Sequence, residues 1–209
     1  QSIEDALSDL RIAIAQQPTH LSWYQLTMEP NTLFWSQPPT LPEDDTLWDI
    51  QEAGQQLLAE HGYLQYEVSA YARAGHQARH NLNYWSFGDF IGIGAGAHGK
   101  LSSPSGQIVR TWKTRLPKDY LDPDKAFLAG ERALTSEELP FEFLMNVLRL
   151  NDGCSSALFT QRTGLPLSVL STARAEAEAR GLLLSDPQRL TASREGQLFL
   201  NDLLQYFLT

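Results

Sequence analysis

A run of glycines at residues 88–99 constrains the fold of this chain more than any other feature of its sequence. Five glycines stand there, directly after the aromatic segment 84–87; His80 precedes them and His98 lies among them. Because glycine has no Cβ, the backbone can lie closer to another backbone or to a ligand than any other residue allows. The segment therefore predicts a surface of close approach.

Two helices and two strands are predicted upstream of this run. Residues 2–16 and 43–61 place apolar side chains at helical spacing behind acidic first turns. Residues 20–28 and 63–71 are short aromatic and apolar runs of strand length. Helix, strand, helix, strand with short connections is typical of a parallel α/β sheet, and the pattern leaves open whether that sheet is open or closed into a barrel.

The second half of the chain changes character. Prolines and a glycine interrupt residues 101–130, which are predicted to be loop-like, and a domain boundary is expected between residues 130 and 131. Beyond it the pattern predicts three helices, a hairpin and a last helix, the outline of a winged-helix domain. The predicted segments are 139–150, 155–163, 167–180, the hairpin runs 182–184 and 189–191, and 193–207.

The charge balance argues against nucleic acid as a partner. The chain has 16 Lys and Arg against 25 Asp and Glu, a formal net charge of −9. In the would-be recognition helix, Arg174 and Arg180 are offset by Glu176 and Glu178. Because phosphate binding needs a basic surplus, a packing or lid module is expected in place of a DNA-reading domain.

Residues 80–100, HNLNYWSFGDFIGIGAGAHGK, resemble the signature of the radical S-adenosylmethionine (radical SAM) proteins related to oxygen-independent coproporphyrinogen III oxidase. They are most similar to the heme-chaperone (HemW-type) branch, of which the HNxxYW motif is characteristic. Residues 20–32, 62–73 and 189–208 are also similar, so the resemblance covers nearly the whole chain.

The resemblance implies the C-terminal units of an incomplete (β/α) TIM-like barrel over residues 1–130. A HemN-type winged-helix-like domain is implied over residues 131–209. Members of this family hold a [4Fe–4S] cluster on clustered cysteines near the N-terminus, whereas this chain has one cysteine, Cys154. Cluster and S-adenosylmethionine are therefore expected only in the full-length protein, and the absent N-terminal half of the barrel is an expected partner. By analogy, Gln25 and the segment 91–97, with Ile93 and Gly94, border the S-adenosylmethionine pocket.

His80 is the candidate metal ligand, through its imidazole to heme iron, with Tyr84 and Trp85 packing on the macrocycle. The alternative is structural: His80 hydrogen-bonds a neighbouring loop carbonyl and the aromatic residues anchor the loop. His98 is a second candidate for ligand contact, although a histidine at a strand end is more often a structural residue.

A local positive patch is predicted downstream, because Arg110, Lys113, Arg115 and Lys118 fall within nine residues that contain no acid. Guanidinium and ammonium groups match carboxylates, so porphyrin propionates are a fitting partner. The alternative is a solvated loop face. Cys154 has no visible histidine partner and is expected to be structural.

The leading hypothesis is a heme-binding, heme-delivering protein of the radical SAM superfamily. Its partners are heme or porphyrin and a heme-accepting membrane protein. The rival is the enzyme oxygen-independent coproporphyrinogen III oxidase, and a scaffold or DNA-binding winged helix is disfavoured by charge. With one cysteine and no apparent signal peptide or membrane span, a soluble cytoplasmic protein is expected. An uncovered sheet edge would favour self-association.

Overall fold

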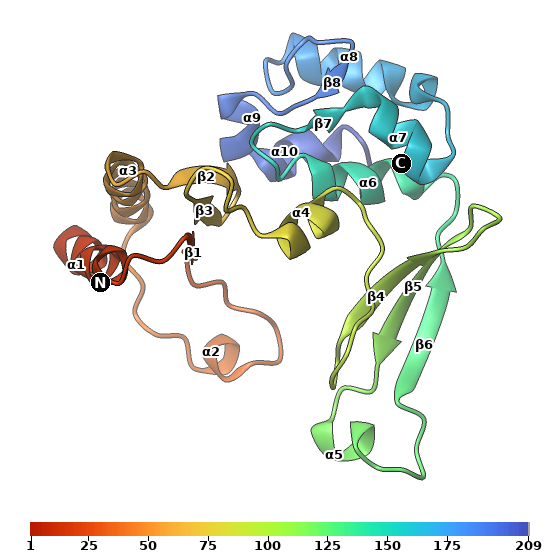
Figure 1. The fold of residues 1–209 in the computed structure, drawn as a ribbon, viewed down its shortest axis with the longest axis horizontal. Helices are drawn as coiled ribbons and strands as arrows, with labels where there is room; N and C mark the ends of the chain where they lie inside the picture. The colour runs from red at the N-terminus through yellow and green to blue at the C-terminus, as the bar shows by residue number, and fades with distance from the viewer. Residues whose placement is uncertain (209) are drawn as a thin grey trace. The chain divides into compact units, whose positions relative to one another are not determined.

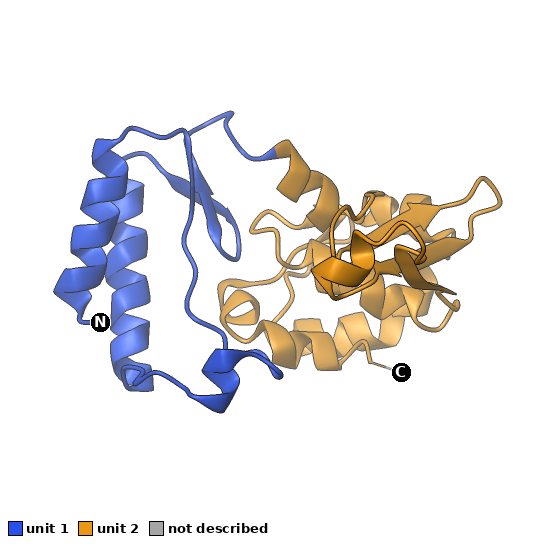
Figure 2. Cartoon of the chain, turned by 90° about the horizontal axis from the view of Figure 1, so that it is seen from below, with its two compact units in different colours: residues 1–78 blue, residues 79–209 orange. Residues whose placement is uncertain are grey.

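The chain forms two compact units in a computed structural model that describes residues 1–208 (Figures 1 and 2). The first unit contains residues 1–78 and the second begins at Arg79. This division into units differs in place from the domain boundary predicted at 130/131, which stays a prediction. No helix within residues 1–208 combines the length and the apolar character needed to cross a membrane.

Two helices give the first unit its core. α1 (Ile3–Ala15) begins at a capping box in which Ser2 and Asp5 satisfy each other's backbone donors, and α3 (Asp44–Glu60) has acids in its first turn, as predicted. The two helices pack together, and Leu10 and Leu58 join Tyr63 and Tyr71 in one buried cluster. A third, short helix, α2 (Leu33–Ser36), lies in the long connection between β1 and α3.

The sheet of the first unit differs from the predicted parallel sheet. Strands β1 (His20–Ser22), β2 (Leu64–Glu67) and β3 (Ala70–Ala72) are ordered β1-β3-β2, and both pairings are antiparallel. The predicted strand 63–71 is in fact a hairpin, because Val68 and Ser69 reverse the chain. The side-chain amide of Gln65 donates to the Val68 carbonyl at 3.0 Å, and the backbone N–H of Ser69 donates to the Glu67 carboxylate at 3.3 Å. Of residues 20–28, only the first three are strand.

The second unit contains an antiparallel sheet where a loop was predicted. Strands β4 (His98–Ser102), β5 (Ile108–Lys113) and β6 (Leu128–Ala133) are neighbours in that order (Figure 1). The prolines and Gly106 that suggested a loop occupy the connections: Gly106 has φ +86° in the β4–β5 turn, and Pro117 opens α5 (Pro117–Tyr120). The β-branched and aromatic side chains of β5 are the strand signal that the prediction missed.

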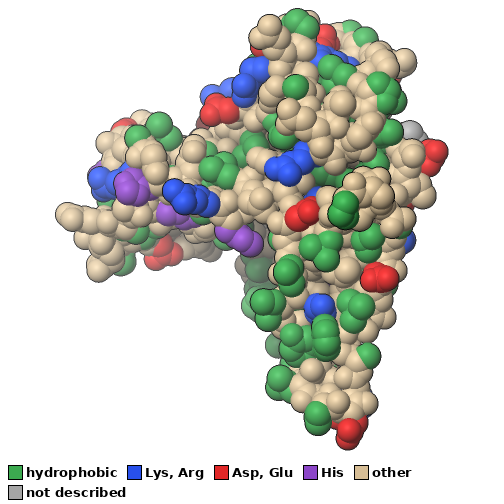
Figure 3. Space-filling view, turned by 45° about the vertical axis from the view of Figure 1, so that its right-hand side comes forward, with side chains coloured by type: hydrophobic (Ala, Val, Ile, Leu, Met, Phe, Trp, Pro, Cys, Tyr) green, Lys and Arg blue, Asp and Glu red, His purple; other side chains and the backbone are tan. Residues whose placement is uncertain are grey.

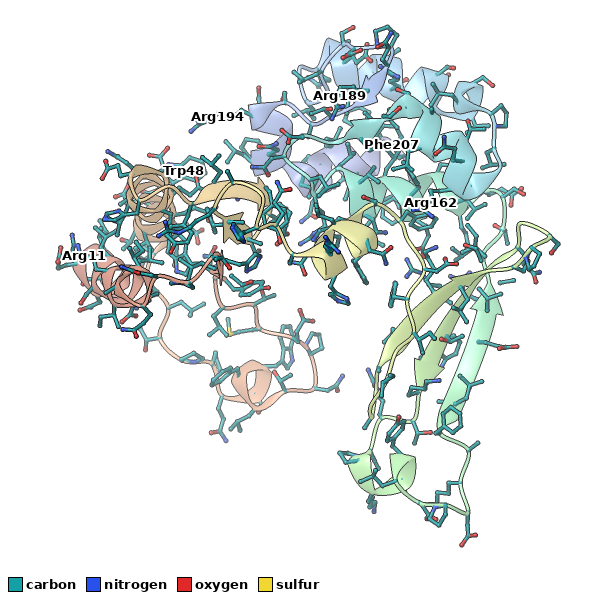
Figure 4. The ribbon with its side chains drawn as sticks, in the orientation of Figure 1. Arg11, Trp48, Arg162, Arg189, Arg194 and Phe207 are labelled. Carbon is teal, nitrogen blue, oxygen red and sulfur yellow. The ribbon has the colours of Figure 1, made fainter. Side chains whose placement is uncertain are left out.

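A helical core fills the rest of the second unit. Phe143 and Phe159 are fully buried in this core. Side chains from most helices of the unit pack in the same cluster, which also includes Phe207 near the end of the chain (Figure 4). The elements are α6 (Leu139–Val147), β7 (Cys154–Ser155), α7 (Ser156–Thr163), η1 (Leu167–Leu170), α8 (Ser171–Ala179), β8 (Arg189–Leu190), α9 (Arg194–Leu198) and α10 (Leu200–Gln205).

The predicted last helix and hairpin are altered in detail. The helix predicted over 193–207 breaks at Phe199, whose ψ of 46° is not helical. In the predicted hairpin, Leu183 and Ala192 form an isolated antiparallel bridge, and the strand β8 pairs with β7. The winged-helix assignment stays a prediction.

Candidate functional site

Helix α4 (Arg79–Trp85) carries the three predicted heme contacts, His80, Tyr84 and Trp85. A buried phenylalanine, Phe87, follows the end of this helix. Phe87 has φ +55°, a left-handed conformation that glycine usually occupies at a helix end. The N–H groups of Phe87 and Gly88 donate to the carbonyls of Tyr84 and Asn83, at 3.1 and 2.8 Å. The Phe87 ring is 1% exposed and packs edge-on against Phe143 at 5.6 Å. Burial of this ring offsets the backbone strain and fixes the end of α4 to α6.

His80 and Tyr84 lie on one face of α4. Residues four apart on a helix are offset by only about 40° around its axis. His80 is exposed, and its imidazole makes no hydrogen bond to any side chain or carbonyl in residues 1–208, so the predicted alternative, a bond to a loop carbonyl, is absent. The Tyr84 ring packs against two other aromatic rings. Its centroid is 4.7 Å from that of Phe90 and 4.8 Å from that of Trp85. The imidazole is therefore available as a ligand beside an ordered aromatic ring.

Trp85 lies on a different side of α4. Five residues turn a helix by about 140° beyond a full turn, which directs Trp85 away from His80. It is half-buried, and the guanidinium of Arg149, which follows α6, stacks on its ring at 4.8 Å. The predicted triad of His80, Tyr84 and Trp85 is thus divided, because only Tyr84 shares a face with His80.

An ion pair fixes the turn that follows α4. The Asp89 carboxylate accepts from Lys100 Nζ at 2.8 Å, from the Ser102 N–H at 2.9 Å and from the Ser102 hydroxyl at 2.8 Å. Lys100 is 2% exposed and lies over the Phe87 ring at 4.3 Å. Burial lowers the pKa of Lys100, and the nearby Arg110 and Arg162, the latter from α7 (Figure 4), lower it further, against the opposing effect of Asp89. Although burial alone would raise the pKa of Asp89, hydrogen bonds from Lys100 and Ser102 outweigh it and the pKa is lowered.

Asp89→Asn is expected to lower the free energy of unfolding by about 2 kcal/mol, because it leaves the Lys100 ammonium buried without a counter-charge. The Asp89 side chain is 40% exposed, so the loss stays below the value for a fully buried pair. Since the folded-state pKa of Asp89 is lowered, the stabilisation is complete above its ordinary value of 3.8 and is lost as the pH falls through the folded-state pKa. Urea unfolding at neutral pH and at low pH measures both effects.

The matched control is the double variant Asp89→Asn with Lys100→Met, which removes both charges and is expected to lose less stability than Asp89→Asn alone. Equal losses in the single and double variants would show that Lys100 needs no counter-charge.

The glycines bring backbone against backbone, which confirms the predicted close approach. Phe90 and Lys100 exchange N–H to O=C hydrogen bonds of 2.9 and 3.0 Å, which adds residues 90–92 alongside β4. A Cβ on Gly92 would lie 2.2 Å from the His98 carbonyl oxygen. Gly94, at φ +110°, donates its N–H to the Tyr120 hydroxyl at 3.0 Å. The run therefore serves the assembly of this part of the sheet.

Apolar side chains are exposed around this segment. Ile91 is 73% exposed and Ile93 is 85% exposed. In Figure 3, hydrophobic side chains gather on the lower part of the second unit, which is formed by β4–β6 and α5. Other exposed apolar side chains in this stretch of sequence are Leu101, Leu116, Leu121, Phe127 and Leu128. An apolar ligand can therefore meet apolar surface here.

The predicted basic patch is divided. Arg110 pairs with Glu142 at 2.5 Å, and Lys113 lies over the Phe127 ring at 4.7 Å. Arg115 and Lys118 are exposed. Alternation along β5 directs Arg110 and Lys113 to opposite faces. Arg110 is thus already neutralised, and the patch does not act as one surface.

The remaining candidates belong to several different elements of the two units. His98 is exposed on β4 opposite Trp112, and Gln25 is exposed in the first unit, whereas Ile93 and Gly94 belong to the second. Cys154 is buried in β7, and burial raises the pKa of its thiol to about 12. Within residues 1–208, no three His, Cys, Asp or Glu side chains are grouped to hold a metal ion. A single buried thiol does not fit a [4Fe–4S] cluster.

Sequence reasoning missed Arg149. It is 64 residues from Trp85 along the chain, and no motif includes it. Only the packing of α4 against α6 brings the two together.

Comparison with known proteins identifies relatives of the whole chain. Residues 134–199 match the family described as the HemN C-terminal domain. The chain is 52% identical over 208 residues to the heme chaperone HemW of Escherichia coli (strain K12), and 49% identical over 209 residues to that of Haemophilus influenzae. Both matches cover 100% of this chain and 54% of the relative. The chain therefore spans about half the length of these relatives.

A solved structure has the same fold. Coproporphyrinogen III oxidase (HemN) from Escherichia coli, described as a radical SAM enzyme, matches with a TM-score of 0.74 over 100% of this chain and 52% of that one. At 16% identity this likeness concerns the fold alone. Together the matches confirm the resemblance to the coproporphyrinogen III oxidase-like proteins and to their heme-chaperone branch, and they confirm the mixed α/β class.

Proposed function

We propose that this chain, which is related over its whole length to the HemW heme chaperones and contains the HemN C-terminal domain, forms their heme-binding and heme-delivering part. The observation that carries the proposal is the uncommitted imidazole of His80 beside Tyr84 on the exposed face of α4. Neutral imidazole is a common axial ligand of heme iron.

The exposure of His80 suits delivery better than storage. A ligand on an open helix face holds one side of the macrocycle and leaves the other side accessible to an acceptor. Burial of apolar macrocycle against Tyr84 contributes roughly 25 cal/mol per Å², so a partly covered heme is held less tightly than one in a closed pocket. The proposed acceptor is a heme-binding membrane protein, and the proposed location is the cytoplasm.

The rival function is that of an oxygen-independent coproporphyrinogen III oxidase, which the shared fold supports. Such chemistry needs S-adenosylmethionine and a [4Fe–4S] cluster, and the single buried thiol of this chain does not fit the cluster. We assign both to the remaining length of the longer relatives, with Gln25, Ile93 and Gly94 as proposed contacts of S-adenosylmethionine. The relatives at 49–52% identity are named heme chaperones, which favours the chaperone.

Titration of the chain with heme tests this function. One heme per chain is expected to bind, with a Soret band distinct from that of free heme. His98→Ala is the matched control, because His98 is also exposed in the second unit and is expected to leave the band unchanged. A spectrum that stays that of free heme at all ratios would refute heme binding by this chain.

A further inference from the structure

An open pocket in the second unit is lined mainly by charged and polar side chains. Side chains of α8, α9 and α10 border it (Figure 1), and its volume is about 570 Å³. This is a typical size for a site that receives a ligand or the side chains of a partner. Two half-buried side chains, Leu182 and Tyr206, form its apolar part. All of the lining residues belong to the second unit, so the pocket lies within one compact body.

Three carboxylates line this pocket, and none of them is neutralised. Glu176 comes from α8, Glu195 from α9 and Asp202 from α10. All three residues are exposed, and within residues 1–208 none of their carboxylates accepts a hydrogen bond or pairs with a basic side chain. By contrast, Glu142 and Glu178 of the same unit each pair with an arginine. The acids of the pocket are therefore available to a ligand.

One basic side chain, Arg180, also lines the pocket. It forms no ion pair with Glu176, although the two residues are four apart at the end of α8. Arg180 is the C-cap of α8, where a cation offsets the partial negative charge of the helix end. Three carboxylates against one guanidinium leave the pocket with a net negative charge.

The ligand that this charge favours is an organic cation. A bare metal ion is not matched, because in the part of the chain that the structure describes no three His, Cys, Asp or Glu side chains are grouped to hold one. Heme does not fit either, since its propionates would face carboxylates. A guanidinium or ammonium group has the opposite charge and donates hydrogen bonds to carboxylate oxygens. Arginine and lysine side chains of a partner protein carry these groups.

Exposed apolar side chains stand beside these acids in the sequence of α9 and α10. Leu198 is 45% exposed and lies three residues after Glu195 on α9, so the two share a face of the helix. Phe199, which is 53% exposed, follows it and precedes Asp202 by three residues. Exposed apolar and aromatic side chains of this kind act as anchors at protein interfaces. The surface therefore suits a segment that combines basic and apolar side chains.

We propose that this pocket docks a basic segment, bearing Lys or Arg, of the protein that accepts the heme. The inference rests on the proposed function, in which the acceptor is a membrane protein. Cytoplasmic loops of membrane proteins carry an excess of Lys and Arg close to their apolar spans. Such a loop offers cations to the three carboxylates and apolar side chains to Leu198 and Phe199. The net charge of −9 on the chain also speeds the encounter with a basic loop.

Two fluorescein-labelled peptides are the probes: a short peptide of arginine and leucine residues, and its twin with neutral citrulline in place of arginine. Fluorescence anisotropy is expected to show tighter binding of the arginine peptide. The double variant Glu195→Gln with Asp202→Asn is expected to weaken that binding roughly fivefold, as the loss of two exposed charge pairs does. It should leave binding of the citrulline peptide unchanged, whereas Phe199→Ser should weaken both peptides alike.

The matched control is the double variant Asp124→Asn with Glu137→Gln. These two exposed acids of the second unit do not line the pocket, and their substitution changes the net charge by the same amount. The control is expected to bind the arginine peptide as the unsubstituted chain does. Equal weakening in the two double variants would show that only net charge attracts the peptide, and would overturn the inference. Displacement of the peptide by an equal concentration of spermidine would also overturn it, in favour of a small polyamine.

Heme titration of the same proteins separates this inference from the proposed function. Glu195→Gln with Asp202→Asn is expected to bind heme as the unsubstituted chain does, because His80 lies on α4 and the substituted acids lie on α9 and α10. A chain that binds heme but shows no preference for arginine over citrulline would overturn the docking pocket alone. A chain that binds the arginine peptide but no heme would refute the proposed function, and with it the assignment of the partner as a heme acceptor.

Discussion

His80→Ala is expected to change the Soret band of the bound heme more strongly than it changes the affinity. The imidazole of His80 supplies the iron bond, whereas contact with Tyr84 and the neighbouring apolar side chains is independent of that bond. Because macrocycle burial scales with apolar area, it persists in the variant. Absorbance titration of both proteins with ferric heme gives the band position and the dissociation constant together.

Two companion variants make this result specific to α4. Tyr84→Ala should weaken heme retention but keep the band position, since it removes macrocycle contact and leaves the iron ligand. His98→Ala should match the unsubstituted chain in both measurements. An unchanged Soret band in His80→Ala would exclude His80 as the axial ligand.

Gly92→Ala is expected to separate residues 90–92 from β4 and to destabilise the chain by about 3 kcal/mol, as a large steric substitution does. A Cβ at this position would lie 2.2 Å from the carbonyl oxygen of His98 and 2.6 Å from its carbon. Both are backbone atoms that cannot rotate away. The hydrogen bonds between Phe90 and Lys100 must then break, and the contact of Phe90 with Tyr84 is lost with them.

Gly94→Ala is the control for Gly92→Ala. Gly94 has open space around it but a φ of +110°, so its substitution brings backbone strain without a collision. We expect a smaller loss, about 1–2 kcal/mol. Urea unfolding followed by circular dichroism compares the two variants, and a loss in Gly92→Ala no larger than that in Gly94→Ala would contradict close backbone approach as the reason for glycine at position 92.

Features encoded locally could be predicted from the sequence. α1 and α3 follow from apolar spacing and from acidic first turns, with Ser2 capping α1. The close approach at Gly92 follows from the absence of a Cβ. The sheet β4–β6 is not predicted, because Pro104, Gly106 and Pro117 suggest a loop over the whole segment. These residues lie in the connections between the strands, and the β-branched and aromatic side chains of β5 are the strand signal in this segment.

Features that depend on distant contacts could not be predicted. The hairpin β2–β3 depends on hydrogen bonds of Gln65 and Glu67 within the turn, which strand propensity does not report. His80 was found through a motif, but the division of the motif between two sides of α4 appears only once the helix is placed. The stacking of Arg149 on Trp85 and the pairing of Arg110 with Glu142 join residues 64 and 32 positions apart. Only the packing of α6 reveals which arginine is neutralised and which is not.

Hydrogen exchange with and without heme tests most directly whether α4 and the glycine segment form the heme site. Bound heme is expected to slow exchange of the backbone amides in residues 79–100 and to leave those of α1 and α3 unchanged, because local contacts restrict local opening. Protection that appears only in other segments, with residues 79–100 unaffected, would contradict a heme site on α4.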